Sequence, residues 1–220
     1  MGNFLAVSAF RDQSVESVVS NTISYAAKYG TTCKPMGPGK VDERTDAIIF
    51  APQKRWTLVL WPQYFNVHDI ELCRILSADM PSLVSTVHVY DDDYWVNAIF
   101  DKGVTVSLFA SVPGYFAETE EDLEKLKAKW SGDANSISQA LSAPREAIAP
   151  YLVHLDAENP NDPGKVFPDD EFELQNFWVF TDLWRRLGIT YPADMTNYAE
   201  RLQLPKDFGR KLPFSDQFEL

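Results

Sequence analysis

Three consecutive aspartates, Asp91, Asp92 and Asp93, are the residues whose types and spacing most suggest chemistry in this chain. They closely follow His88, and a histidine beside a carboxylate is a pair that a hydrolase can use for proton transfer. Adjacent carboxylates at a hairpin tip are solvated, however, whereas general acid catalysis needs a buried carboxyl group or a constrained neighbour. The pattern therefore favours a turn or a recognition surface, and we predict no catalytic residue.

A metal site at these aspartates is also disfavoured. Successive side chains of an extended segment alternate between faces, so only Asp91 and Asp93 can converge. A hard cation takes about six or more oxygen ligands, and nothing in the nearby sequence fixes the remaining ones. We therefore predict no metal ligand in this segment.

The cysteines, histidines and glycines elsewhere show no cofactor motif. Cys33 and Cys73 lack a metal-ligand spacing and are expected to be reduced thiols. His68 and His154 are isolated in the sequence. The segment GPGK, residues 37–40, lacks the long glycine loop and the following Ser or Thr of a phosphate-binding loop, so we expect a flexible turn. Neither a tightly bound metal nor a covalent cofactor is expected.

Aromatic residues stand beside two acidic clusters, the three aspartates and residues 118–122. Tyr94, Trp95, Tyr115 and Phe116 are the aromatics in question. Aromatic side chains supply anchoring area at a protein interface and carboxylates steer a basic partner, although Trp95 and Phe116 can equally belong to the core. The predicted partner-binding residues are Asp91, Asp92, Asp93, Tyr94, Trp95, Glu118, Glu120, Glu121 and Asp122.

The charge of the chain points in the same direction. Its 220 residues include 32 acidic and 20 basic side chains, which gives a net charge of -12 and a pI near 4.6. Binding to nucleic acid is disfavoured because it depends on Lys and Arg displacing counterions, and a faint helix-turn-helix rhythm in residues 133–155 carries few basic groups. The surplus suits a basic protein partner, or serves solubility alone. No membrane-spanning or signal segment is apparent, so we expect a cytoplasmic protein.

Hydrophobic periodicity predicts an α+β fold in two regions. Residues 1–116 should form a mainly antiparallel sheet of about five or six strands with helices on one face, near 14–29 and 69–79. The predicted strands cover the apolar runs at 4–10, 46–51, 56–61, 82–90, 94–100 and 104–111. Residues 117–220 should form a helical region that packs on the sheet within one globular unit.

Three helices are predicted in the second region, over residues 119–130, 133–155 and 169–189. Thr119 followed by Asp122 is a capping-box type of helix start. The last helix carries a wide apolar stripe in which Trp178 and Trp184 should be buried.

The sequence resembles, in overall texture, the immunity proteins that accompany bacterial polymorphic toxins. The segments that carry this resemblance are WTLVLWPQYFN, STVHVYDDDYW and NFWVFTDLWRRLGITYP. The resemblance implies a small, acidic, cytosolic α+β protein that binds a toxin and blocks it. Two other hypotheses stay open, namely a hydrolase-type enzyme that uses a carboxylate and His88 in a cleft, and a regulatory module of unknown partner.

Overall fold

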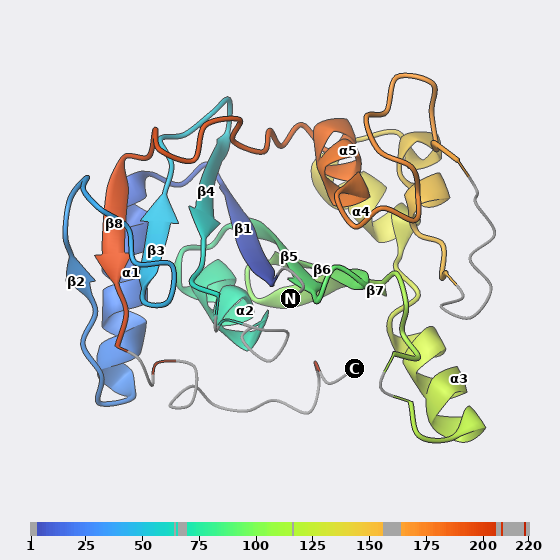
Figure 1. The fold of residues 1–220 in the computed structure, drawn as a ribbon, viewed down its shortest axis with the longest axis horizontal. Helices are drawn as coiled ribbons and strands as arrows, with labels where there is room; N and C mark the ends of the chain where they lie inside the picture. The colour runs from blue at the N-terminus through green and yellow to red at the C-terminus, as the bar shows by residue number, and fades with distance from the viewer. Residues whose placement is uncertain are drawn as a thin grey trace.

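A single antiparallel sheet organises the chain. The computed structural model describes residues 4–63, 65, 70–115, 117–155, 164–205, 208 and 218. Within these ranges eight strands lie in the order β2-β8-β3-β4-β1-β5-β6-β7, and every neighbouring pair is antiparallel (Figure 1). The strands are β1 (Leu5–Arg11), β2 (Lys34–Pro35), β3 (Asp46–Ile49), β4 (Trp56–Leu60), β5 (Leu83–Tyr90), β6 (Tyr94–Asp101), β7 (Val104–Ala110) and β8 (Glu200–Gln203).

The strands predicted from apolar runs are present, and their burial explains their composition. β1, β5 and β6 are buried almost throughout their length, which is why they appear in the sequence as nearly continuous β-branched and aromatic runs. The sheet is nevertheless wider than the five or six strands expected. The additional strands are β2 and β8, each four residues or shorter.

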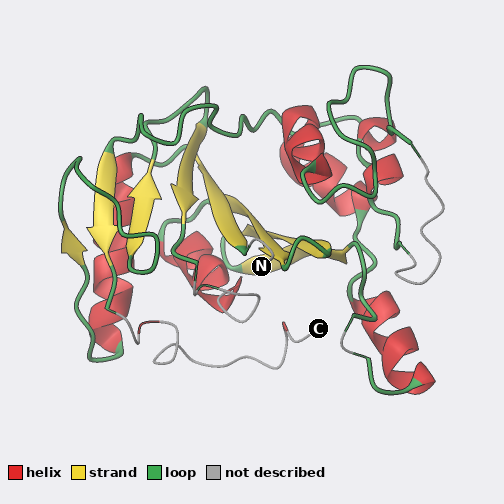
Figure 2. Cartoon of the chain, viewed as in Figure 1, coloured by secondary structure: helices red, strands yellow, loops and turns green. Residues whose placement is uncertain are grey.

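Helices cover both faces of the sheet, so the prediction that they cover one face is wrong (Figure 2). α1 (Val15–Lys28) and α2 (Ile70–Asp79) pack on one face and confirm the two helices predicted there. α4 (Ala134–Leu141) and α5 (Val179–Arg186) pack on the other face. The nearly continuous apolar runs of β1, β5 and β6 were the sequence signal for this arrangement, because strands buried on both faces lose the polar alternation that marks a solvated face.

The second region is not mainly helical, contrary to the prediction. α3 (Glu120–Lys129) matches its predicted range, and Figure 1 shows it at the periphery of the molecule. α4 stops at Leu141 because Ser142 adopts a left-handed conformation, with φ of 55°, and two 3-10 helices follow it over residues 142–155, Arg145–Ala147 and Ala149–Tyr151. The region also contributes a strand, β8, to the sheet.

The last helix is much shorter than the predicted range of 169–189. The backbone N–H groups of Glu171 and Phe172 donate to the carboxylate of Asp182, at 3.0 and 2.9 Å to its Oδ2 atom. A carboxylate within the helix thus supplies the acceptor for two backbone N–H groups of the segment that precedes it. Trp184 is buried as predicted, whereas Trp178 lies just before α5 and is only half-buried.

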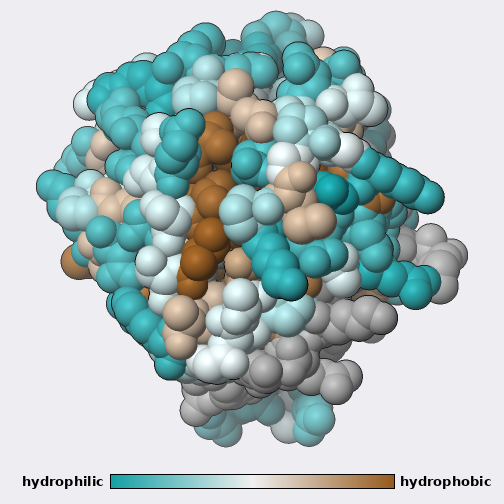
Figure 3. All heavy atoms as spheres, turned by 90° about the vertical axis from the view of Figure 1, so that its left-hand side faces the viewer, coloured by the Kyte–Doolittle hydropathy of each residue, from teal (hydrophilic) through white to brown (hydrophobic). Residues whose placement is uncertain are grey.

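The β2 end of the sheet is closed by strands that are distant in sequence. β8 lies between β2 and β3, and Pro35 in β2 lacks the N–H that an edge strand offers to other chains. From this side the surface is mostly hydrophilic, with a narrow apolar stripe across it (Figure 3). α1 carries three half-buried residues at intervals of four, Val15, Val19 and Ile23. Small apolar areas of this kind are ordinary on a protein surface, so we assign them no role.

Candidate functional site

The three aspartates form the exposed tip of the β5–β6 hairpin. The N–H of Asp93 donates to the carbonyl of Tyr90 at 3.0 Å, which closes a four-residue turn. The two central residues, Asp91 and Asp92, have positive φ angles of 54° and 64°. Aspartate tolerates this left-handed backbone better than most residues, and two such residues define the turn type that matches the twist of a hairpin. The turn interpretation is therefore confirmed.

The two aromatic residues predicted to bind a partner beside this tip are in the core. Tyr94 is 1% exposed and Trp95 is 2% exposed. They are consecutive on β6, so they point to opposite faces: Tyr94 packs in the α1 and α2 layer, and Trp95 in the α4 and α5 layer. Neither side chain presents a surface to a partner, and the alternative reading of Trp95 as a core residue is the correct one. Phe116 lies outside the described residues.

Other aromatic rings surround the tip at the surface, and sequence reasoning missed their grouping. Phe4 is 39% exposed and Tyr115 is 36% exposed, while Tyr90 is half-buried. The ring of Tyr90 lies 4.9 Å from that of Phe4 and 5.9 Å from that of Tyr115, centroid to centroid. Tyr94 supports this group from below, with its ring centroid 4.7 Å from that of Tyr115.

A hydrogen bond joins this aromatic group to the acidic tip. The Tyr115 hydroxyl donates to Oδ2 of Asp93 at 2.6 Å. This bond, with the negative charges of Asp93 and Asp91 nearby, raises the pKa of Tyr115 to about 12, because ionisation would break the bond and place a phenolate beside carboxylates. We use the name acidic–aromatic surface for Asp91, Asp92, Asp93, Phe4, Tyr90 and Tyr115.

The second predicted acidic cluster lies at the start of α3. The Thr119 hydroxyl oxygen accepts the N–H of Asp122 at 3.1 Å, so the predicted helix start is confirmed. Glu118, Glu120 and Glu121 are exposed, and Glu121 forms an ion pair with Lys125 at 2.8 Å. Carboxylates in the first helical turn also interact favourably with the helix dipole. These acids thus have a local structural role as well as a surface position.

His88 is inside the sheet, away from the surface of the hairpin tip. Its side chain is 2% exposed, and its Nε2 atom lies 3.3 Å from the Thr86 hydroxyl. Thr86 in turn accepts a hydrogen bond from Ser8 at 2.8 Å, and Ser8 also accepts the indole N–H of Trp61 at 2.8 Å. This polar row ties the central strands together in the buried layer beneath α1 and α2. It does not form the cleft that the hydrolase hypothesis requires.

In the part of the chain that the structure describes, His154 and the GPGK segment show no sign of a catalytic or ligand-binding role. His154 contacts the carbonyl of Trp130 at 3.1 Å, whereas His68 lies outside the described residues. In the GPGK segment, the N–H of Gly37 donates to the Glu200 carboxylate at 2.6 Å, so a carboxylate of the protein occupies the position that a bound anion would need.

Within the described ranges, no group of three or more His, Cys, Asp and Glu residues is arranged to hold a metal ion, and no helix is long and apolar enough to cross a membrane.

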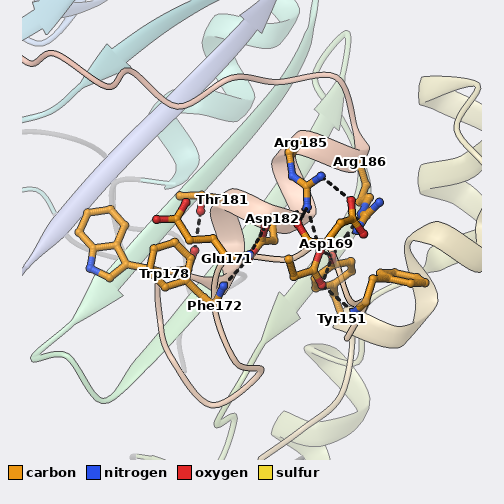
Figure 4. A network of polar contacts seen from close by, with 11 residues as sticks. Tyr151, Asp169, Glu171, Phe172, Trp178, Thr181, Asp182, Arg185 and Arg186 are labelled. Carbon is orange, nitrogen blue, oxygen red and sulfur yellow. Dashed lines mark hydrogen bonds and ion pairs between the residues drawn. The ribbon is translucent and has the colours of Figure 1, made fainter. Parts of the chain in front are cut away.

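The largest polar network lies elsewhere and was not anticipated from the sequence (Figure 4). We use the name Asp–Arg cluster for Tyr151, Asp169, Asp170, Asp182, Arg185 and Arg186. Asp170 has a fully buried side chain that accepts the Tyr151 hydroxyl at 2.7 Å and the Arg186 guanidinium at 2.7 Å. Arg185 bridges all three aspartates, at 2.8, 3.0 and 3.1 Å from Asp169, Asp170 and Asp182.

The charges of this cluster compensate one another. The guanidinium groups of Arg186 and Arg185 hold the pKa of Asp169 well below its usual range, and Asp169 raises the pKa of Arg186 in return. The Arg186 guanidinium also lies 4.5 Å from the ring centroid of Phe167. Because these groups bind each other, the arrangement fastens the segment 164–174 onto α5. From the sequence alone, only Asp182 and Arg185 could be identified as a possible ion pair, because they are three residues apart on one helix.

Comparison with known proteins adds no relative to this description. No family model matches the chain, and no curated protein or solved structure matches it either. The class that the fold defines is therefore an α+β protein with helices on both faces of one antiparallel sheet.

Proposed function

We propose that this chain is a non-enzymatic, cytosolic protein-binding protein, and most specifically an immunity protein that neutralises a toxin by direct binding. The observation that carries the proposal is the hydrogen bond between Tyr115 and Asp93, which joins exposed aromatic rings and exposed carboxylates into one surface. Aromatic rings supply most of the binding energy in many protein interfaces, and carboxylates around them select a basic partner.

The aromatic part of the surface differs from the one expected from the sequence. Phe4, Tyr90 and Tyr115 take the role that was assigned to Tyr94 and Trp95, whose side chains are buried. Tyr94 still contributes indirectly because its ring supports Tyr90 and Tyr115 from the core side. The surface is therefore held by the hairpin together with residues next to β1 and β7, which favours binding without a large ordering cost.

The charge of the whole chain supports the choice of a basic partner. A net charge of -12 attracts a cationic protein over distances comparable with the Debye length. The exposed carboxylates of the hairpin tip then orient the approaching partner. Close charge pairs in a well-formed complex contribute about 1.5 to 7 kcal/mol. Glu118, Glu120, Glu121 and Asp122 would extend the same acidic field along the start of α3.

Co-expression with the product of the gene directly upstream tests this function, because immunity genes commonly follow their toxin genes. That product alone should arrest growth, and the wild-type chain should restore it. The variant D91N/D92N/D93N should restore growth less well and should associate with the purified toxin more slowly at low salt, because asparagine keeps the turn but removes three charges. The difference in association rate should shrink as salt rises.

A matched control removes three charges from outside the acidic–aromatic surface. The variant E146Q/E171Q/E173Q changes exposed acids outside the acidic–aromatic surface and should protect cells as the wild type does. An upstream product without toxicity, or equal protection by both triple variants, would count against the proposal. Equal association rates of the wild type and D91N/D92N/D93N at low salt would leave the aspartates as turn residues only.

A further inference from the structure

A polar pocket lies at the end of the sheet opposite the hairpin tip. It has a volume of about 260 Å³ and is formed where the end of β1 and the start of β5 meet α4. Its lining includes two arginines and two aspartates, Arg11, Arg55, Asp12 and Asp101. A space of this size fits a small molecule and is distinct from the acidic–aromatic surface.

Two of these four charged groups neutralise each other. Arg55 donates to both carboxylate oxygens of Asp12, at 2.7 Å for the bond from its Nε atom, and this bond lowers the pKa of Asp12. The remaining two charged groups, Arg11 and Asp101, are half-buried. In the part of the chain that the structure describes, neither of them forms a direct ion pair, and the Asp101 carboxylate makes no hydrogen bond, although the charge of Arg11 also acts on the neighbouring Asp12 carboxylate. A guanidinium and a carboxylate therefore line one pocket without compensating each other.

The surroundings of Arg11 leave most of its donors available. Its Nη1 atom donates to the carbonyl of Ala140 at 3.3 Å, in the last turn of α4, and its guanidinium lies 6.0 Å from the Trp56 ring centroid. A guanidinium has five N–H donors in a fork that matches a carboxylate. These contacts hold the side chain at the pocket and still permit it to bind an anionic group.

The strand register places the apolar residue Leu83 between the two charges. Leu83 on β5 pairs with Asp101 on β6, and Phe10 pairs with Val84, so Arg11 and Leu83 are the next residues along β1 and β5. Neighbouring strands are about 4.8 Å apart, which separates the backbones of β1 and β6 by about 10 Å. Arg11 and Asp101 thus present opposite charges on either side of an apolar floor.

We propose that this pocket binds a small zwitterion, a molecule with one carboxylate for Arg11 and one ammonium group for Asp101, such as a free amino acid. A simple anion would leave Asp101 uncompensated and would be repelled by the net charge of -12. A simple cation would leave the Arg11 guanidinium without a directly bound carboxylate. Only a ligand with both charges complements both residues, and its carbon chain lies over Leu83.

Titration of the isotopically labelled chain by NMR tests the proposal with defined probes. Glycine, β-alanine and 4-aminobutyrate differ in the spacing of their two charges, and the zwitterion that fits should shift the amide signals of Arg11, Ser82 and Asp101. N-acetylglycine lacks the ammonium group and glycine methyl ester lacks the carboxylate. Each should bind at least about tenfold more weakly than the best zwitterion, because a charge-assisted hydrogen bond is lost.

Two variants test separately whether Arg11 binds the carboxylate of the ligand and whether Asp101 binds its ammonium group. Arg11→Gln should weaken binding of the zwitterion and leave N-acetylglycine no better bound than the methyl ester, whereas Asp101→Asn should remove the preference for an ammonium group. Because Arg11→Gln also loses a contact with α4, Asp101→Asn keeps the test valid if the first variant folds poorly. Arg44→Gln and Glu173→Gln are exposed controls outside the pocket and should bind as the wild type does.

The proposal fails in either of two ways. One is that none of the three zwitterions shifts the Arg11, Ser82 and Asp101 amides at the highest soluble concentration. The other is that the singly charged analogues bind as tightly as the zwitterions, which would show that the two charges do not act together.

Discussion

Asp91 and Asp92 both have left-handed backbone conformations at the hairpin tip. Most L-residues lose about 1 to 2 kcal/mol in this conformation, whereas aspartate, asparagine and glycine adopt it at lower cost. The composition of the tip therefore has a structural explanation for two of the three aspartates. Asp93 has a different role because its carboxylate accepts the hydroxyl of Tyr115.

Substitutions at Asp92 should distinguish the effect of its backbone conformation on stability from the effect of its charge. Asp92→Asn should leave the free energy of unfolding nearly unchanged, and Asp92→Ala should lower it by about 1 kcal/mol because alanine tolerates the left-handed region poorly. Urea denaturation of the two variants beside the wild type measures this difference. Equal stabilities of the alanine and asparagine variants would contradict the structural role of the turn.

The ionisation of Tyr115 should report on its bond with Asp93. The structure places the pKa of Tyr115 at about 12, and Asp93→Asn should move it down toward the ordinary tyrosine value of about 10, because the carboxylate that disfavours the phenolate is lost. An NMR titration of ring-labelled tyrosine, with Tyr115→Phe to assign the signal, follows this pKa. An unchanged pKa in Asp93→Asn would mean that the two side chains are not bonded in solution.

Among the elements, α5 depends on polar contacts as much as on its apolar face. Its Asp182 binds the backbone of Glu171 and Phe172, and its two arginines bind Asp169 and Asp170. The sequence indicated an apolar helical stripe over a much longer range, since Leu174, Phe177 and Trp178 fit the helical period. It could not indicate that a carboxylate of the helix would bind the backbone of the preceding segment, because that contact depends on the tertiary path of the chain.

The Asp–Arg cluster should make stability depend on pH in the acid range. The folded-state pKa of Asp169 is lowered below its unfolded value, so its contribution is complete above about pH 4 and declines as the pH falls below that value. Unfolding free energies from urea denaturation at pH 6 and pH 3 should therefore differ less for Asp169→Asn than for the wild type. The control Asp79→Asn removes a carboxylate of a single exposed ion pair and should change this pH dependence less. The same pH dependence in Asp169→Asn and the wild type would exclude a role of the cluster.

At the scale of the whole molecule, helical layers pack on both sides of the sheet. Trp184 connects the second layer to the sheet, since it is fully buried and its indole N–H donates to the Ser85 hydroxyl at 3.0 Å. Ser85 also accepts a hydrogen bond from Asn97 on the neighbouring strand β6 at 2.9 Å. The attachment of α5 thus combines apolar burial with a polar contact to the centre of the sheet.

Truncation of this residue should destabilise the protein strongly. Trp184→Ala should lower the free energy of unfolding by about 3 to 5 kcal/mol, because a large aromatic side chain is lost from a packed site. Trp178→Ala is the matched control on the same segment and should cost less, since Trp178 is half-buried. Thermal and urea denaturation measure both values. If Trp184→Ala melted like the wild type, α5 would be peripheral and not part of the core.

The parts of the fold that could be predicted are those whose local sequence determines their secondary structure. β1, β5, β6, α1 and α2 carry strong hydrophobic periodicity, and the three-aspartate turn carries the correct residue type for its backbone. β8 could not be found in this way, because its sequence ERLQ has one buried apolar residue and becomes a strand through pairing with β3 and β2. The surface grouping of Phe4 with Tyr115 was equally hidden, because the two residues are far apart in the chain.

The position of β8 between β2 and β3 has a consequence for the order of events during synthesis. Asp46 on β3 and Arg201 on β8 form an ion pair across 155 residues of sequence. Until residues 200–203 have left the ribosome, β3 has one open edge and β2 has no neighbour in the sheet. Domains whose contacts are so distant in sequence fold slowly and expose unpaired strand edges while they do. The nascent chain therefore cannot complete its sheet in the order of synthesis, and this edge closes only after β8 has emerged, later than the strands β1 to β7.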